Sequence, residues 1–158
     1  MAADDERHNE ELQQLVTFRL GDDEFGIEIL KVQEIIRSMD ITKVPRAPDF
    51  VEGVINLRGK VIPIIDLRGR FNLPRKPQDE HTRIINCMIN NILVGIVVDA
   101  VSEVLRISTN TISPPPPVIA GVDADYVSGV GRLQNRLLII LDLDKMLTTE
   151  DIAQLGAM

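Results

Sequence analysis

The sequence predicts an all-β protein with short helices, made of two copies of one unit that form small barrels or a sandwich. Short runs of β-branched and apolar residues alternate with tight turns along the chain, which is typical of barrels and sandwiches. In addition, residues 53–67 match residues 129–143 without a gap. Two copies in a chain of 158 residues should pack their apolar faces together and leave a groove between them.

The repeated stretch predicts a hairpin followed by a short helix. Residues 54–57 and 61–65 are apolar and β-branched, as in buried strands. Gly59 lies between them and supplies the positive φ angle that a tight turn requires. Asp66 follows the second strand, and we expect it to cap a helix that continues through Phe71.

The second copy keeps this chemistry with different residues. Asn135 takes the place of Gly59, and asparagine also tolerates the left-handed conformation. Asp142 takes the place of Asp66, so the same capping role is expected for both carboxylates. A final helix should then run from Asp142 through Leu155.

A second match extends the repeat towards the N-terminus. Residues 25–36 align with residues 94–105, again without a gap. We therefore expect approximate repeats at residues 15–71 and 84–147, both within a single domain that covers residues 15–158. The polar stretch between the repeats is the expected boundary between them.

The composition argues against several classes of function. The formal net charge is −7, from 17 basic and 24 acidic residues, and the chain has four Phe, one Tyr and no Trp. An acidic surface with few rings to stack on bases argues against nucleic-acid binding. Residues 1–14 form a polar tail without the basic start and apolar run of a signal peptide. No apolar run approaches the roughly 20 residues of a membrane helix. We therefore expect a cytoplasmic protein without membrane insertion.

The sequence predicts no catalytic, cofactor or metal site. His8 and His81 lie in polar segments, without a Cys or a second His at metal-ligand spacing. Cys87 lies within an apolar run, where a buried thiol behaves as a small hydrophobic side chain. The chain is therefore not expected to be an enzyme.

Three features leave alternatives open. The first hairpin turn carries Arg58 where the second copy has Gln134, so Arg58 is either an ordinary solvated arginine or a contact for a partner. Residues 114–117 are all proline, and form either a stiff loop or a polyproline ligand. Four apolar residues of the matching segments 25–36 and 94–105 either belong to the core or line a binding groove: Val32, Ile35, Val104 and Leu105.

Four segments of the chain together form a specific family pattern: residues 18–27, 30–35, 53–66 and 94–99. Through these segments the chain resembles the CheW family of chemotaxis coupling proteins over nearly its whole length. The resemblance implies two SH3-like β-barrel subdomains related by internal duplication, plus a C-terminal helix. It also implies a non-catalytic adaptor that couples the cytoplasmic tips of chemoreceptors to the regulatory domain of the histidine kinase CheA.

The resemblance further implies a set of receptor-binding residues: Val32, Glu34, Gly53, Arg58, Gly95 and Val104. The kinase contact is expected on strand surfaces of the subdomains. Two other functions stay open, namely an adaptor for a different kinase pathway and a small-ligand-binding β-barrel protein.

Overall fold

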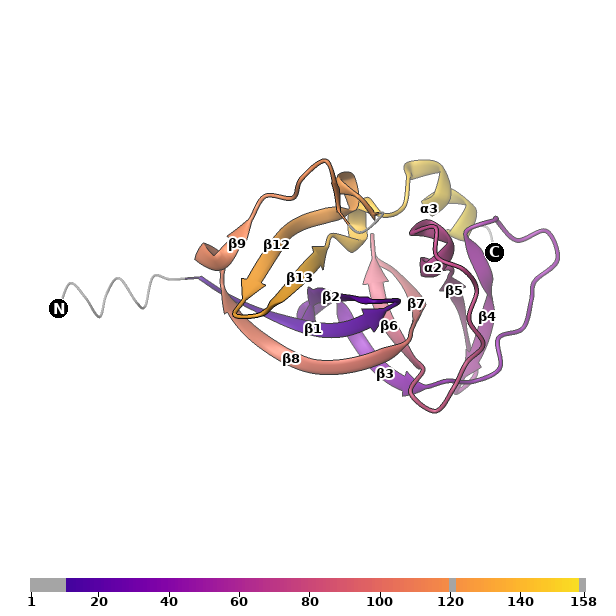
Figure 1. Cartoon of the computed structure of the whole chain (residues 1–158). Helices are drawn as coiled ribbons and strands as arrows, with labels where there is room; N and C mark the ends of the chain where they lie inside the picture. Colours follow the sequence, from indigo (N-terminus) through magenta and orange to yellow (C-terminus); the bar gives the residue numbers. More distant parts are fainter. Residues whose placement is uncertain (1–10, 120–121, 157–158) are drawn as a thin grey trace.

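A computed structural model describes residues 11–119 and 122–156, and the all-β class with short helices is confirmed (Figure 1). Most of the predicted polar tail, including His8, lies outside the described residues. The first strand begins at Leu12 and thus includes the last residues of that tail.

The chain forms two larger sheets, with the first on the left of Figure 1 and the second on the right. The first sheet has the strand order β8-β1-β2-β13-β12-β9 and the second has the order β3-β6-β7-β5-β4. The strands of the first sheet are β1 (Leu12–Leu20), β2 (Asp23–Glu28), β8 (Ala100–Ser108), β9 (Ile112–Ser113), β12 (Val127–Leu133) and β13 (Arg136–Leu141). The strands of the second are β3 (Val32–Arg37), β4 (Val51–Leu57), β5 (Lys60–Ile65), β6 (Arg83–Ile89) and β7 (Ile92–Val98). A small separate pair consists of β10 (Val118–Ile119) and β11 (Val122–Asp123).

Each sheet takes strands from both sequence repeats. The hairpin β1-β2 of the first repeat joins the hairpin β12-β13 of the second, and the join is the parallel pair β2-β13. Conversely, the hairpin β6-β7 of the second repeat joins β4-β5 of the first through the parallel pair β5-β7. The two joins have the same register, because Gly26 pairs with Ile140 as Gly95 pairs with Ile64. The two copies are therefore interwoven rather than placed side by side.

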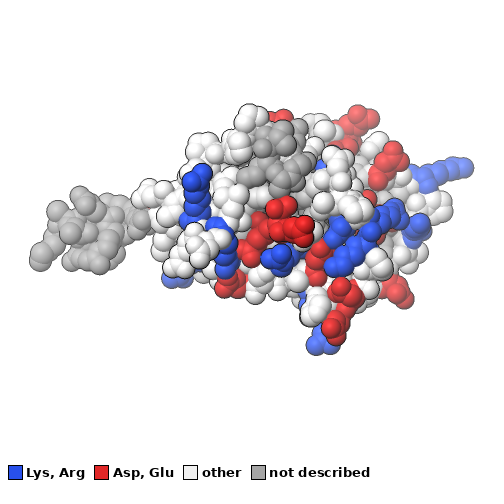
Figure 2. All heavy atoms as spheres, in the orientation of Figure 1, with Lys and Arg blue, Asp and Glu red and all other residues white. Residues whose placement is uncertain are grey.

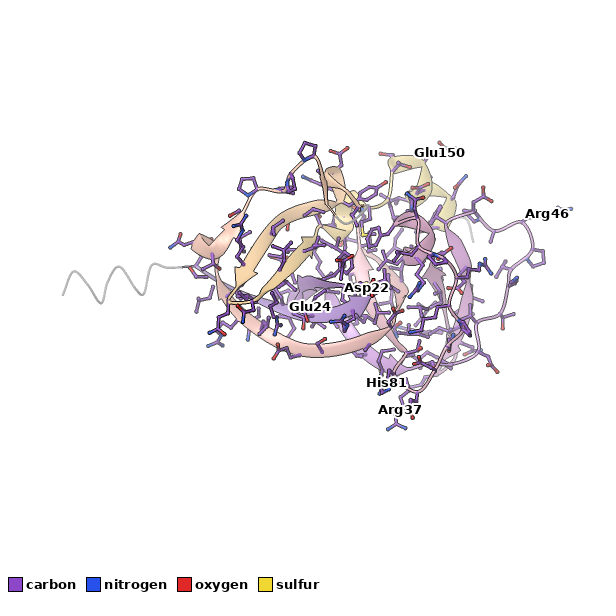
Figure 3. The ribbon with its side chains drawn as sticks, in the orientation of Figure 1. Asp22, Glu24, Arg37, Arg46, His81 and Glu150 are labelled. Atoms are coloured by element: carbon purple, nitrogen blue, oxygen red, sulfur yellow. The ribbon has the colours of Figure 1, made fainter. Side chains whose placement is uncertain are left out.

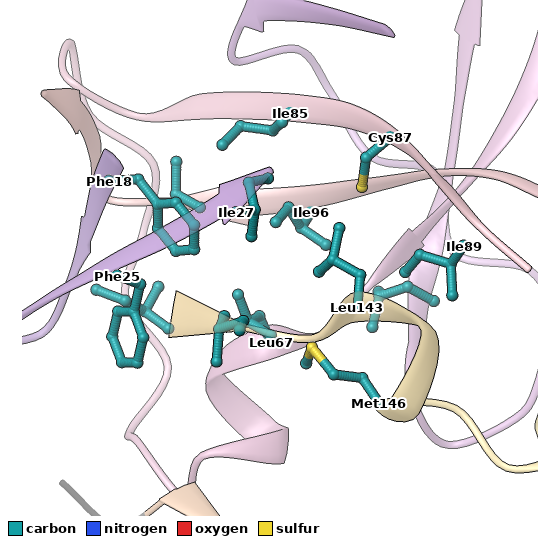
Figure 4. Close-up of a cluster of buried hydrophobic side chains, with 14 of the residues drawn as sticks. Phe18, Phe25, Ile27, Leu67, Ile85, Cys87, Ile89, Ile96, Leu143 and Met146 are labelled. Atoms are coloured by element: carbon teal, nitrogen blue, oxygen red, sulfur yellow. The ribbon is translucent and has the colours of Figure 1, made fainter. Parts of the chain in front are cut away.

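The two sheets share one central core, and each has a smaller core on its other face. The central core takes large apolar side chains from both sheets, among them Phe25 and Ile96 (Figure 4). The smaller core of the first sheet contains Leu15 and Ile140. The smaller core of the second sheet contains Ile64 and Ile84, which are the repeat equivalents of those residues. The predicted packing of apolar faces between the copies is therefore present in the central core.

The predicted cap at the first helix is confirmed, but the one at the second is wrong. Asp66 Oδ1 accepts a hydrogen bond from Gly69 N at 3.0 Å at the start of α2 (Leu67–Arg70). A Cβ at Gly69 would lie 2.5 Å from the Asp66 carboxylate, so this cap needs a residue without one. The second repeat has Lys145 at the equivalent place, and Asp142 makes no side-chain cap.

The final helix is shorter than predicted. A 3-10 turn at Leu143–Lys145 ends before α3 begins, and α3 covers Thr149–Gly156. Asp151 on α3 forms an ion pair with Arg70 on α2, with Nη2 and Oδ2 at 2.9 Å. Leu155 is buried in the central core. This helix therefore packs against the body of the protein.

The two hairpin turns also differ from each other. In the first, Gly59 has a φ angle of 83°, as predicted, and Arg58 has 52°. In the second, the left-handed residue is Gln134 with a φ angle of 42°, rather than Asn135.

Acidic and basic side chains are interspersed on the face of the protein that Figure 2 shows. Within the described parts of the chain, no helix is both long and apolar enough to cross a membrane.

Candidate functional site

The turn between β4 and β5 presents Arg58 to solvent. Arg58 and Gly59 form the two-residue loop between the paired residues Leu57 and Lys60. Asn56 Oδ1 accepts a hydrogen bond from Gly59 N at 3.1 Å and so braces the turn. The side chain of Arg58 is 69% exposed.

Glu34 on β3 holds the guanidinium of Arg58 in one direction. Arg58 Nη1 donates to Glu34 Oε2 at 3.1 Å, and Nη2 donates to Oε1 at 2.5 Å. This hydrogen bonding raises the pKa of Arg58 and lowers the pKa of the Glu34 carboxyl. A two-point contact fixes the plane of a guanidinium as well as its position. The structure thus brings together two of the residues that the family resemblance implied.

Gly53 on β4 and Gly95 on β7 are buried within the second sheet. A Cβ on Gly53 would lie 2.4 Å from the carbonyl oxygen of Thr42, which pairs with the adjacent β4 residue Val54. A Cβ on Gly95 would lie 2.6 Å from Ile64 Cδ1. Both glycines therefore set the shape of the second sheet and offer no side chain to a partner.

The two valines of the predicted site lie on different sheets. Val32, on β3, is half-buried against the central core and pairs with Cys87 of β6. Val104, on β8 of the first sheet, is 53% exposed and pairs with Val16. Ile35, which the sequence left between core and groove, is also exposed.

A hollow of about 400 Å³ opens beside the Glu34–Arg58 pair. Its lining residues are Gln33, Glu34, Leu57, Arg58, Lys60, Ile62, Asn86 and Leu93. Sequence reasoning missed Asn86, which is 1% exposed on β6. The signal available was a single carboxamide in the apolar run of residues 84–89.

His81 and Cys87 are not part of this hollow. His81 lies near the end of the long loop before β6, close to Arg37 in Figure 3, and is exposed. Cys87 is buried in the central core, and this burial raises the pKa of its thiol to about 12. The thiol is therefore protonated at neutral pH, which disfavours a role as a nucleophile.

With this geometry in view, comparison with known proteins identifies the family. The model of the CheW-like domain matches residues 14–151. The chain belongs to the CheW-like domain family.

Relatives and a solved structure agree with this assignment. The chain is 43% identical to the chemotaxis protein CheW of Klebsiella aerogenes, over 89% of this chain and 85% of that protein. It is 38% identical to the chemotaxis protein CheW of Treponema pallidum, over 94% of this chain and 89% of that protein. The crystal structure of the scaffolding protein TtCheW from Thermoanaerobacter tengcongensis has a TM-score of 0.81 and 38% identity, covering 91% of this chain and 93% of that one.

Proposed function

We propose that this protein is a chemotaxis adaptor that couples chemoreceptor cytoplasmic tips to the histidine kinase CheA. In this role it would work in the cytoplasm, at receptor arrays, and make the activity of the kinase depend on the ligand state of the receptor. The names of its relatives, which are chemotaxis and scaffolding proteins, support this role. The family is one of adaptors, so catalysis is not part of the proposal.

The observation that carries the receptor contact is the oriented guanidinium of Arg58. The carboxylate and the hydrogen-bonded turn already restrict the side chain of this exposed arginine. It therefore loses little conformational entropy when a partner binds. A receptor tip is a helical hairpin, and a helix can place one face against such a surface. We infer that Val32, Glu34, Arg58 and Val104 contact the receptor, and that Gly53 and Gly95 act by leaving space. The kinase would use strand surfaces elsewhere.

The proposal is tested with Arg58→Gln, because Gln134 already occupies the equivalent turn position at positive φ. The variant should keep its stability within about 0.5 kcal/mol, as most surface substitutions do. Co-sedimentation with receptor-tip fragments should weaken by about tenfold, as expected for a hot-spot arginine. Binding to CheA alone should not change.

Arg46→Gln is the matched control, because Arg46 is also an exposed arginine with positive φ, at 62°, in a different loop (Figure 3). It should bind the receptor fragment as the unaltered protein does. Equal receptor affinity for the Arg58 variant would remove Arg58 from the site. Failure of the unaltered protein to bind either partner would reject the adaptor role itself.

A further inference from the structure

Asn86 is a polar exception on an otherwise apolar face of the second sheet. It pairs with Glu34 of β3 on one side and with Gly95 of β7 on the other. On the same strand and face lies Ile84, which belongs to the small core of this sheet. Asn86 thus stands where that core reaches the hollow.

The carboxamide of Asn86 is buried without a partner. Among the described residues, neither its Nδ2 nor its Oδ1 has a hydrogen-bond partner. The other two polar residues that are almost fully buried have partners: Thr17 Oγ1 donates to the carbonyl of Glu103 at 3.0 Å, and Thr82 Oγ1 accepts from Asp79 N at 2.8 Å. Single buried atoms of the partly exposed Gln13, Glu24 and Arg70 also lack a hydrogen bond, but among the described residues Asn86 lacks one at both of its polar atoms. A buried donor and acceptor that are left unpaired destabilise the fold, whereas an apolar side chain of similar size would not. Folding therefore gives no reason for an asparagine at this position.

The site has room for the carboxamide on one side and an opening on the other. Gly95 provides the room, because a Cβ there would lie 3.0 Å from Asn86 Oδ1. The opening is the hollow, and Asn86 lines it together with Glu34 and Arg58. The Arg58 side chain is 69% exposed, and exposed ion pairs add little to stability.

We propose that Asn86 determines specificity by binding a carboxamide side chain, that of an asparagine or glutamine, which the receptor helix inserts into the hollow. This inference rests on the proposed receptor contact. A carboxamide carries a donor and an acceptor side by side, so it can pair with both free atoms of Asn86. A carboxylate would leave Oδ1 unpaired and would also face Glu34. A lysine or arginine would leave Nδ2 unpaired.

The test compares Asn86→Val with the unaltered protein in titrations of a receptor-tip fragment. The variant should be at least as stable in urea, because it removes an unpaired carboxamide. Its affinity for the fragment should fall by about tenfold, the loss expected from two neutral hydrogen bonds in a buried contact. Binding to CheA should be unchanged.

Replacing each Asn and Gln of the fragment by Leu in turn should identify the inserted residue. One replacement should weaken binding to the unaltered protein and have little further effect on Asn86→Val, as a double-mutant cycle requires for a direct pair. Ile84→Val is the control, since it alters packing on the same strand and face without changing a polar group. It should bind the fragment normally.

The outcomes separate this inference from the proposed function. If the unaltered protein binds the fragment and Asn86→Val binds equally well, the carboxamide is merely hydrated and the inference is overturned alone. If the unaltered protein does not bind the fragment, the receptor role fails and this inference fails with it. Should Asn86→Val not fold, Asn86→Thr replaces it, and the side-chain amide NMR signals of Asn86 in the unaltered protein must shift on titration. Unshifted signals would also overturn the inference.

Discussion

The two copies of the repeat share the same backbone arrangement, but their side chains at equivalent core positions differ. In the first copy, Phe25 stacks between Phe18 and Phe71, with ring centroids at 5.7 and 5.3 Å. The equivalent residues of the second copy are much smaller and non-aromatic: Cys87, Val94 and Leu147. All six belong to the central core, and Figure 4 shows Phe18 and Phe25 at one end and Cys87 nearer the other. Equivalent positions in the fold therefore do not imply equal contributions to stability.

The two copies also differ at the two junctions, which are the places where the chain passes from one sheet to the other. At one junction, Asp99 Oδ2 accepts hydrogen bonds from Gly21 N at 2.9 Å and from Arg68 Nη2 at 2.7 Å. At the other, Asp144 accepts from Asn90 N at 3.0 Å and from Lys31 Nζ at 2.8 Å. Each carboxylate binds a hairpin turn and a cation.

The carboxylate of the ion pair comes from a different segment of the chain at each junction. Asp99 follows β7, whereas Asp144 follows β13 and is the repeat equivalent of Arg68. Asp99 itself aligns with Leu30 rather than with Lys31, so the two ion pairs have opposite polarity but do not match residue for residue. Their exposure also differs, because both side chains are 16% exposed at the first junction and 37% at the second.

The largest expected effect is at the aromatic end of the core. Phe25→Ala should lower the free energy of unfolding by about 3–5 kcal/mol, because it leaves a cavity between two rings. Val94→Ala, its counterpart, should lose about 2 kcal/mol for the two carbons removed. Urea unfolding of both variants measures the difference. Equal losses would mean that the two ends of the core are packed alike.

The junctions should differ next. Asp99→Ala should lose about 2–3 kcal/mol, because it leaves the largely buried Arg68 without its carboxylate. Asp144→Ala should lose about 1 kcal/mol, since its partner Lys31 is better hydrated. Chemical denaturation at pH 7 and low salt decides between them. A larger loss at Asp144 would contradict the ranking by burial.

The second junction also has a defined pH dependence. The hydrogen bond from Lys31 lowers the pKa of Asp144, and the same contact raises the pKa of Lys31. The stability from Asp144 is therefore complete above its unfolded pKa of about 3.9 and is lost as the pH falls through its lower folded value. The difference in the free energy of unfolding between the unaltered protein and Asp144→Ala should accordingly become smaller below pH 4.

Cys87 can ionise, whereas Phe18, its equivalent in the first copy, cannot. Burial raises the thiol pKa to about 12 from an ordinary value of 9.0, so the thiol ionises first in the unfolded chain. Stability should therefore fall as the pH rises through 9, by about 1.4 kcal/mol at pH 10 relative to pH 7. Cys87→Val should lack this extra loss. Unfolding curves for the two proteins at both pH values provide the check.

The smallest expected difference is between the hairpin turns. Gly59→Ala should lose about 1 kcal/mol of unfolding free energy through the positive φ angle alone, because a Cβ there meets no atom of the described residues within 4 Å. Asn135→Ala should stay within about 0.5 kcal/mol, as at an ordinary surface position. Thermal and urea unfolding would disprove this if the Asn135 variant lost as much as the Gly59 variant.

Features decided by neighbouring residues could be predicted from the sequence. The first hairpin, its left-handed Gly59 and the Asp66 cap depend on residues within a few positions of one another. The cap at Asp142 was predicted wrongly, because the carboxylate is conserved between the copies but Gly69 is replaced by Lys145. The cap forms only where the third residue after the aspartate lacks a Cβ. The pattern of apolar residues does not indicate this requirement.

Long-range choices could not be read in the same way. Because the two copies have the same pattern, the hairpin β1-β2 could pair equally well within its own copy or with the other. The pairing of Glu34 with Arg58 depends on how distant strands come together, and no local signal marks it. The unpartnered carboxamide of Asn86 likewise becomes visible only once its neighbours are placed.

The interweaving of the sheets makes the protein mechanically stiff. The chain crosses from the first sheet to the second through only residues 29–31, and returns through Asp99 alone. Connections this short leave no linker about which one sheet could swing, and the carboxylates of Asp99 and Asp144 clamp both crossings. A push on one sheet should therefore move the other as part of the same solid body. An adaptor built in this way moves as one rigid body. A displacement of one binding surface is therefore transmitted in full to the other.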